Sequence, residues 1–262
     1  DFLKIYLTYI FYLCQVYFTG VNPFNPKESN TAMKPGNKIQ KIPRQPLAVT
    51  AYETIIRKII CLEYMPSQHL EENQLVSELG IGRTPVREAL VRLQGEKMVE
   101  SHPNKGVVVR PITLQNTKAM FESMHIFEFG VVDMALNRDC SPFIEKMKNA
   151  NEEVRRAIQS NKVFRLVEAN HEFHMQFARC SQNEFLIRAV EDVRKEAKRL
   201  SYLSYDNTID PERPLEVHYD SVVAEHETMI RALADRNEKK LKQLLLAHIE
   251  TFRQRIILFM TS

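Results

Sequence analysis

Glycine is scarce in this chain, and its distribution is uneven. The 262 residues include 7 glycines, of which four lie between Gly80 and Gly106 and only Gly130 follows residue 112. Strand-rich folds and loops that cradle phosphate groups need more glycine-containing turns than residues 112–262 can supply. We therefore expect that segment to be helical.

Cysteine is also sparse, and long apolar runs are missing. The four cysteines, Cys14, Cys61, Cys140 and Cys180, form no C-x-x-C pair, which argues against a zinc ribbon, a dithiol redox motif or a disulfide framework. This pattern fits a reducing cytoplasm. The apolar segment 5–18 is shorter than the roughly 20 residues that a membrane-spanning helix needs, so we expect no membrane partner.

Neither sign of charge dominates the sequence. The chain has 36 Lys+Arg and 33 Asp+Glu, a formal net charge of +3, and no polybasic block. Residues 44–111 contain 9 basic and 8 acidic side chains, and residues 112–262 contain 22 and 23. A histone-like nucleic-acid binder is thereby disfavoured, and any contact with DNA must depend on a local cluster of basic residues.

Residues 1–46 differ from the rest of the chain. The apolar segment 5–18 is followed by polar, proline-rich residues 20–46, which are typical of a flexible lead-in. A signal peptide is disfavoured, because no basic segment precedes the apolar run and no clean small-residue cleavage site follows it. We interpret residues 1–46 as a leader or flexible extension, with the functional chain starting near Met33.

Residues 47–113 have the element order of a winged helix-turn-helix. Apolar residues at helical spacing predict a helix that ends at Pro66 and a second helix over about 71–79, followed by the tight turn Gly80-Ile81-Gly82. We expect the third helix to begin with Thr84 as its N-cap and Pro85 at its first position. The runs 98–101 and 107–110 then predict a hairpin.

Residues 114–262 are expected to form a mainly helical second domain. The pattern predicts six helices, at about 114–138, 142–160, 162–180, 183–203, 217–235 and 237–260, with one substantial loop at 204–216. The predicted fold is therefore mainly α: an N-terminal winged helix-turn-helix and a C-terminal bundle of about six helices.

The third helix carries the candidate DNA contacts. Arg83 and Arg87 are four residues apart, so they share one face at the helix end that enters the major groove in helix-turn-helix docking, whereas Arg92 is less well placed. Thr84 can add a hydrogen bond to a phosphate. At the tip of the hairpin, Asn104, Lys105 and Gly106 can approach the DNA backbone or the minor groove.

The segment 79–93 (LGIGRTPVREALVRL), with residues 96–99 and 102–108, resembles the DNA-binding domain of the GntR family of bacterial transcription regulators. The resemblance implies DNA contacts by seven residues: Asn73, Arg83, Thr84, Arg87, Asn104, Lys105 and Gly106. Asn73 stands where some members have Arg, which puts a base contact there in doubt. Gly82 stands where the family usually has Ser or Thr, which removes a hydrogen bond to phosphate.

Three histidines lie on inward helix faces of the second domain. Asn170 and His174 share one stripe, His226 lies on another and His248 on a third. A single histidine on an apolar face is usually a hydrogen-bonded core residue, whereas three on three facing helices can be satisfied by one shared metal ion. From the spacing alone, both interpretations stay open.

Residues 114–260 resemble the helical ligand-binding domain of the FadR-type (FCD) branch of GntR regulators, through the segments 170–177 (NHEFHMQF), 225–233 (EHETMIRAL) and 245–248 (LLAH). The six helices match the VanR-like group better than the seven-helix FadR group. In this family an Asp and three His bind a divalent metal that helps to hold a small carboxylate effector. The resemblance implies the ligand set Asn170, His174, His226 and His248.

Two departures from the family pattern affect this expectation. Asn170 replaces the Asp, so the ligand set loses one negative charge, and we expect a weaker metal site with a more positive centre. Zinc is the expected metal, with nickel or manganese as alternatives. Met124 replaces an Arg that precedes the first-helix Glu, here Glu128, and that can contact the effector. Either another basic residue does this work or the effector differs.

We therefore expect a cytoplasmic, non-enzymatic transcription regulator, acting as a homodimer on palindromic operator DNA and controlled by a small organic acid. One alternative is a metal-dependent enzyme, in which three His activate a water molecule. Helical phase turns Glu172 and Glu225 away from the cavity, so no general base is evident. A second alternative is a metal-free bundle that serves only for dimerisation.

Overall fold

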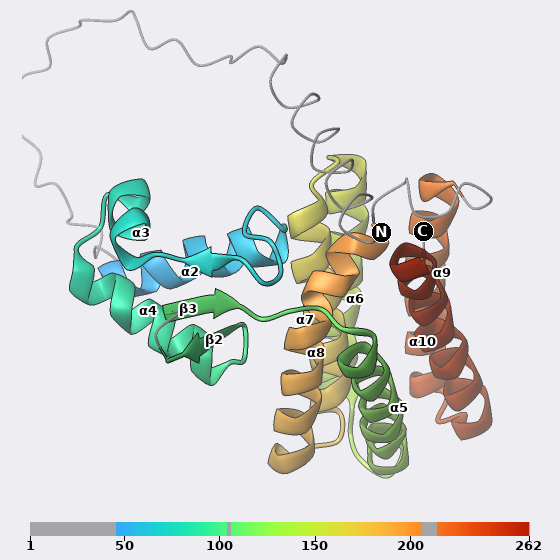
Figure 1. Cartoon of the computed structure of the whole chain (residues 1–262). Coiled ribbons are helices and arrows are strands. Elements are labelled where there is room, and N and C mark those ends of the chain that lie inside the picture. Colours follow the sequence, from blue (N-terminus) through green and yellow to red (C-terminus); the bar gives the residue numbers. More distant parts are fainter. Residues whose placement is uncertain (1–45, 104–105, 206–213, 262) are drawn as a thin grey trace, which may run out of the picture. The chain divides into compact units, whose positions relative to one another are not determined.

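The computed structural model describes residues 46–103, 106–205 and 214–261 (Figure 1). This part of the chain contains helices α2 to α10 and one three-stranded sheet. The predicted lead-in, residues 1–46, lies almost entirely outside the described residues, as do the hairpin residues 104–105 and most of the predicted loop 204–216. No helix within the described ranges is long and apolar enough to cross a membrane.

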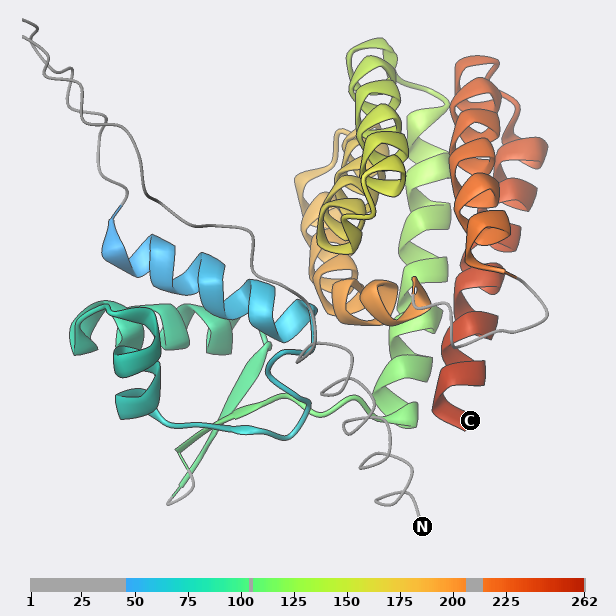
Figure 2. The ribbon, with the colours of Figure 1, turned by 90° about the horizontal axis from the view of Figure 1, so that it is seen from above.

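The first part of the described chain has the predicted winged helix-turn-helix order. Its elements, visible in Figures 1 and 2, are α2 (Leu47–Ile60), β1 (His69–Leu70), α3 (Glu72–Leu79), α4 (Arg83–Gly95), β2 (Val99–His102) and β3 (Gly106–Val109). The sheet is antiparallel in the order β1-β3-β2, with Val99 opposite Val109. Ile55, Ile59, Val86 and Leu93 are fully buried between the helices and fix α4 against α2.

Two details of this region differ from the prediction. Helix α4 begins at Arg83, and its N-cap is the extended residue Gly82, so Thr84 is not the N-cap and Pro85 is the third helical residue. Pro85 is tolerated there because the first four N–H groups of a helix have no partner within the helix. The two-residue strand β1 was not predicted, since so short an element has no alternating pattern.

The second part consists of six helices, as predicted. They are α5 (Leu114–Ala135), α6 (Ser141–Gln159), α7 (Val163–Arg179), α8 (Glu184–Ser204), α9 (Leu215–Ala234) and α10 (Glu238–Thr261). Every boundary lies within three residues of its predicted position. Local chemistry explains two of the starts: Thr113 Oγ1 accepts a hydrogen bond from Asn116 N–H, and Asn183 Oδ1 caps α8.

These helices enclose the apolar core that positions the histidines. Helix α6 packs against α7 and α9, and α5 packs against α8 and α10, an arrangement that can be followed in Figure 2. The core includes Met124, Phe173, Phe177 and Leu245, each at most 1% exposed. Met124 is thus an ordinary core residue, four positions before the buried Glu128 on the same face of α5.

Candidate DNA-binding surface and metal centre

The two arginines of α4 lie on its exposed side and share one acidic partner. The Arg83 and Arg87 side chains are 59% and 63% exposed, and their Nε atoms lie 3.1 and 2.7 Å from the two carboxylate oxygens of Glu72. Arg83 Nη2 also donates to Asn73 Oδ1 at 2.7 Å. These contacts bring Asn73, Arg83 and Arg87 together at the start of α4, with Thr84 exposed beside them.

The arrangement suits recognition of a polyanion. Glu72 holds the two guanidinium groups in place. Because exposed ion pairs contribute little to stability, little free energy is lost when the arginines release Glu72 and contact DNA instead. Arginine can then donate two parallel hydrogen bonds to a guanine edge or to a phosphate. The geometry therefore provides a cationic surface at the N-terminus of α4.

Glycine is required at the base of the wing. Gly106 has φ +69°, and a Cβ atom there would lie 2.9 Å from His69 Nε2 of the neighbouring strand β1. A side chain at this position is strained by the positive φ, and the His69 ring would have to shift. The other two predicted wing contacts, Asn104 and Lys105, lie outside the described residues.

The three predicted histidines meet in the helical domain. His174 comes from α7, His226 from α9 and His248 from α10, and one ring nitrogen of each lies within 4.8 Å of the others. His174 Nε2 and His248 Nε2 are 3.2 Å apart. His174 and His226 are fully buried, and His248 is 8% exposed. We call these three residues the His cluster.

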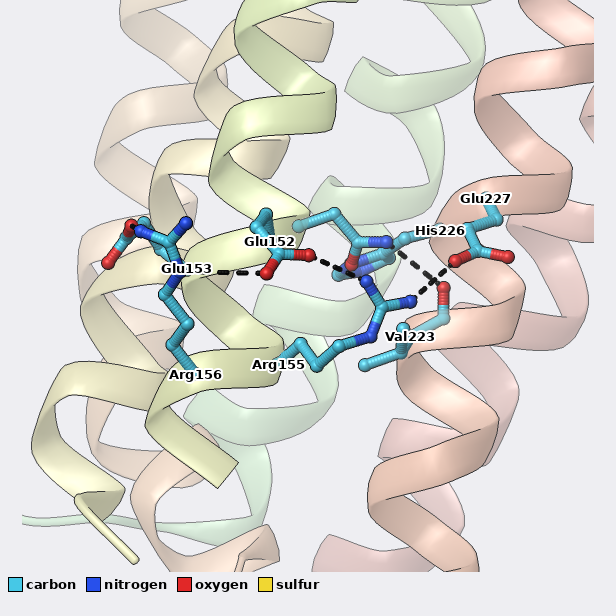
Figure 3. A network of polar contacts seen from close by, with 8 residues as sticks. Glu152, Glu153, Arg155, Arg156, Val223, His226 and Glu227 are labelled. Atoms are coloured by element: carbon cyan, nitrogen blue, oxygen red, sulfur yellow. Dashed lines mark hydrogen bonds and ion pairs between the residues drawn. The ribbon is translucent and has the colours of Figure 1, made fainter. Parts of the chain in front are cut away.

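His226 is oriented by a residue of the neighbouring helix α6. Its Nδ1 lies 2.9 Å from Asn151 Oδ1, while the amide nitrogen of Asn151 donates to the carbonyl oxygen of Val223 (Figure 3). Because Asn151 presents its oxygen, the ring hydrogen of His226 is on Nδ1. Its Nε2 then carries a lone pair instead of a hydrogen, and this atom is buried without a hydrogen-bond partner.

Glu225 orients His248, which corrects the expectation that its side chain points away from the cavity. Glu225 Oε2 lies 2.6 Å from His248 Nδ1, and Glu225 lines a small cavity together with His248 and Asn170. Helical phase places a residue only relative to its own helix. It therefore could not predict that α10 brings His248 to this face of α9. Glu172 does point away, toward Gln176 and Arg179.

Asn170 lies in the same cavity. Its Oδ1 atom is buried and has no hydrogen-bond partner, although a buried amide oxygen normally has one. The cavity has a volume of about 20 Å³, which is room for about one water molecule. The structure thus brings the three predicted histidines together, and Asn170 lines the same cavity as His248.

Arg194 of α8 contacts the His cluster, and the sequence analysis missed it. Its side chain is 5% exposed, it forms an ion pair with the buried Glu128, and its Nη2 donates to His174 Nδ1 at 2.8 Å. A signal was available, because Arg194 lies between Val190 and Ala197 on the buried stripe of α8. Unlike Met124, it is a basic residue, and it lies beside Glu128.

Burial keeps His174 and His226 uncharged. Desolvation, and after it the positive charge of Arg194, lowers the pKa of His174 well below its ordinary range. The pKa of His226 is lowered in the same way, by burial first and then by His248 and Arg194. Neutral imidazoles are the form that binds metal ions, so these residues keep that form through the physiological pH range.

The donor set fits a divalent metal ion. His226 offers an unpartnered Nε2 and Asn170 an unpartnered oxygen, and acceptors behind His226 and His248 fix their rings as they do around metal-bound histidines. Nitrogen ligands with one amide oxygen suit zinc, nickel or manganese. A metal bound here would act as a Lewis acid toward an anionic ligand.

Comparisons with known proteins agree with this architecture. Residues 47–109 match the family model "Bacterial regulatory proteins, gntR family", and residues 119–251 match the FCD domain. The Nta operon transcriptional regulator of Aminobacter aminovorans is 25% identical over 76% of this chain and 89% of its own. The HTH-type transcriptional repressor RspR of Escherichia coli is 20% identical over 82% of this chain and 90% of its own.

Solved structures share the fold. Escherichia coli McbR/YncC superposes with a TM-score of 0.65 at 16% identity, over 83% of this chain and 99% of that one. Lar, which controls the expression of the Listeria monocytogenes agr system, gives a TM-score of 0.58 at 18% identity, over 81% of this chain and 97% of its own. The two relatives named above by sequence are a transcriptional regulator and a transcriptional repressor. With its winged helix-turn-helix and its FCD domain, this chain belongs to the GntR family of transcriptional regulators, in the FCD subfamily.

Proposed function

We propose that this regulator binds palindromic operator DNA as a homodimer, and that its operator affinity is set by a divalent metal and a small carboxylate bound at the His cluster. The observation that carries the proposal is the convergence of His174, His226 and His248 from three helices, with His226 Nε2 and Asn170 Oδ1 buried and unpartnered. The DNA contacts are assigned to Asn73, Arg83, Thr84, Arg87 and the wing residues Asn104, Lys105 and Gly106.

The DNA contacts are tested by selecting binding sites from a randomised duplex library and measuring affinity by fluorescence anisotropy. We expect the double variant Arg83→Ala/Arg87→Ala to bind the selected site at least about tenfold more weakly, because each lost arginine contact is worth about 1–3 kcal/mol. The double variant Arg156→Ala/Arg253→Ala, which removes two exposed arginines of α6 and α10, controls for the change in net charge. Unchanged affinity of Arg83→Ala/Arg87→Ala would overturn this assignment.

The metal site is tested by zinc titration and by metal analysis of the purified protein. We expect one equivalent of zinc per chain in the wild type and loss of this zinc in His226→Ala. His125, a histidine of α5 outside the cluster, gives the matched control His125→Ala, which should retain the metal. Equal zinc content in all three proteins would refute the site.

Helix α8 provides a route from the His cluster to the DNA-binding region. Arg194 reaches His174, and further along the same helix the buried Arg199 donates to the backbone oxygen of Arg110 at 2.6 Å. Glu196 pairs with the Arg110 side chain at 3.2 Å. Arg110 directly follows β3 of the wing. A shift of α8 on ligand binding would therefore act on the wing, as coupling between two sites requires.

The carboxylate effector is supported by Arg194, a buried basic residue that lines the cavity. A thermal-shift screen of small carboxylates and sugar acids on zinc-loaded protein tests it, because a bound ligand raises the melting temperature. We expect hits in the wild type and none in His226→Ala.

The homodimer is supported by exposed apolar side chains, including Leu114 and Ile126 of α5, 66% and 67% exposed. Analytical ultracentrifugation should give a mass twice the 30.6 kDa of the chain. A purely monomeric sedimentation profile at micromolar concentration would contradict dimerisation. A regulator that reads chromosomal DNA acts in the cytoplasm, and we propose that location.

A further inference from the structure

His174 differs from its two neighbours in the partner that its Nδ1 atom meets. His226 Nδ1 faces Asn151 Oδ1 and His248 Nδ1 faces a carboxylate oxygen of Glu225. His174 Nδ1 faces Arg194 Nη2, at 2.8 Å. The first two partners accept hydrogen bonds, whereas a guanidinium group can only donate.

The partner determines which ring nitrogen carries the hydrogen. A neutral imidazole has one N–H and one lone pair, so Nδ1 of His174 must present its lone pair to Arg194 and its hydrogen must be on Nε2. That hydrogen then points to His248 Nε2, 3.2 Å away. His248 can accept it, because Glu225 holds the hydrogen of His248 on Nδ1. All four groups are satisfied in this arrangement.

The same arrangement opposes metal binding by His174. A ligand nitrogen of the cluster must offer a lone pair toward the shared centre, and His174 Nε2 offers a hydrogen instead. Moving that hydrogen to Nδ1 would bring two N–H groups, those of Arg194 and His174, against each other. The Arg194 charge adds repulsion toward a divalent cation, since Arg194 and the cluster are buried together.

We infer that Arg194 is a built-in competitor of the metal: it engages the lone pair of His174 Nδ1 and must release it before His174 becomes a ligand. The inference rests on the proposed metal site and adds its regulation. Glu128 keeps Arg194 paired on its other side, so the guanidinium retains a counter-ion when it leaves His174. Its position on α8 ties this release to the helix that contacts Arg110.

The inference is tested first by zinc affinity, measured by competition with a chromophoric chelator. We expect Arg194→Met to bind zinc about tenfold more tightly than the wild type or better, the scale of effects of groups behind metal ligands. Because Glu128 would lose its partner, the double variant Arg194→Met/Glu128→Gln is measured as well. Arg188→Met, an exposed arginine of the same helix, is the matched control and should bind as the wild type does.

The second test reads the hydrogen position on His174 directly, from the ¹⁵N chemical shifts of the histidine rings in chelator-treated protein. The His174 signals are assigned by their loss in His174→Gln. We expect the hydrogen on Nε2 in the wild type and in Arg188→Met, and on Nδ1 in the double variant.

The outcomes separate the inference from the proposed site. If zinc binds the wild type and the double variant equally well, or if His174 carries its hydrogen on Nδ1 in the wild type, Arg194 does not compete and the inference is overturned while the metal site stands. If zinc binds none of the proteins, the double variant included, both fail. Tighter zinc binding by the double variant together with the expected hydrogen shift supports both.

Discussion

At the residue scale, the chemistry of the His cluster is decided by the atoms behind each ring. The oxygens of Asn151 and Glu225 set the lone pairs of His226 and His248 toward the shared centre, and Arg194 sets that of His174 away from it. The partner of Nδ1 decides whether the ring hydrogen is on Nδ1 or on Nε2. The three histidines therefore differ in whether Nε2 offers a lone pair to a metal ion.

A carboxylate at position 170 should strengthen the metal site. Asn170→Asp places a negative charge at an atom that is buried, unpartnered and in the cavity beside His248. We expect zinc affinity to rise by about tenfold or more, because carboxylates are stronger ligands of divalent cations than amide oxygens. Chelator competition measures it, with the exposed Asn161→Asp as control. Equal affinities for Asn170→Asp and the wild type would mean that residue 170 is not a ligand.

Acid should destabilise the metal-free protein through His174 and His226. Their folded-state pKa values lie well below the unfolded value of about 6.5, so the unfolded chain binds more protons below pH 6.5 and stability falls as the pH falls. Two such groups lower the free energy of unfolding by about 2 kcal/mol between pH 6.5 and 5.5. Urea unfolding followed by circular dichroism checks this. The variant His174→Gln/His226→Gln should show a flatter pH profile, and an equally steep one would contradict the assignment.

At the scale of elements, the sequence predicted the helices well because their signals are local. Apolar spacing and the near absence of glycine after residue 112 located α5 to α10 within three residues. The start of α4 was misplaced, because Thr84-Pro85 resembles a capping pair, while the chain adopts the helical conformation two residues earlier, after the extended Gly82. Cap geometry depends on backbone angles that residue type alone does not determine.

Two glycines of the helix-turn-helix should respond oppositely to alanine. Gly80 ends α3 with φ +63°, where a Cβ atom is strained, so Gly80→Ala should lower the free energy of unfolding by about 1 kcal/mol. Gly95 is the last residue of α4, and a Cβ atom there meets nothing within 4 Å. Gly95→Ala should therefore raise stability by about 0.5–1 kcal/mol. The urea midpoints of the two variants, measured against that of the wild type, test this. Midpoint shifts of the same sign would contradict this account of the turn.

At the scale of the whole molecule, the sequence predicted which histidines meet but not what surrounds them. His174, His226 and His248 each lie on the apolar stripe of their own helix, so a bundle brings them together. Contacts between helices, such as Arg194 with His174 and Glu225 with His248, depend on how neighbouring helices are rotated and spaced. That information is absent from the periodicity of any single helix.

The chain thus combines a cationic surface on α4 with a buried site that α8 connects to the linker residue Arg110. Such a link predicts reciprocity: if occupancy of the His cluster changes operator affinity, operator DNA must change the affinity of the cluster by the same factor. The operator duplex should change the zinc affinity by the same factor by which zinc changes the operator affinity, as titrations with and without the other ligand measure. A change in only one of these two affinities would exclude an equilibrium coupling.

The most direct test is the affinity of the selected operator duplex for chelator-treated protein, for zinc-loaded protein, and for zinc-loaded protein with acetate, lactate, malate or gluconate. We predict that at least one loaded state differs from the chelator-treated state by about fivefold or more, and that His226→Ala shows no such difference. The same affinity in every state, with calorimetry showing that zinc is bound, would contradict the account.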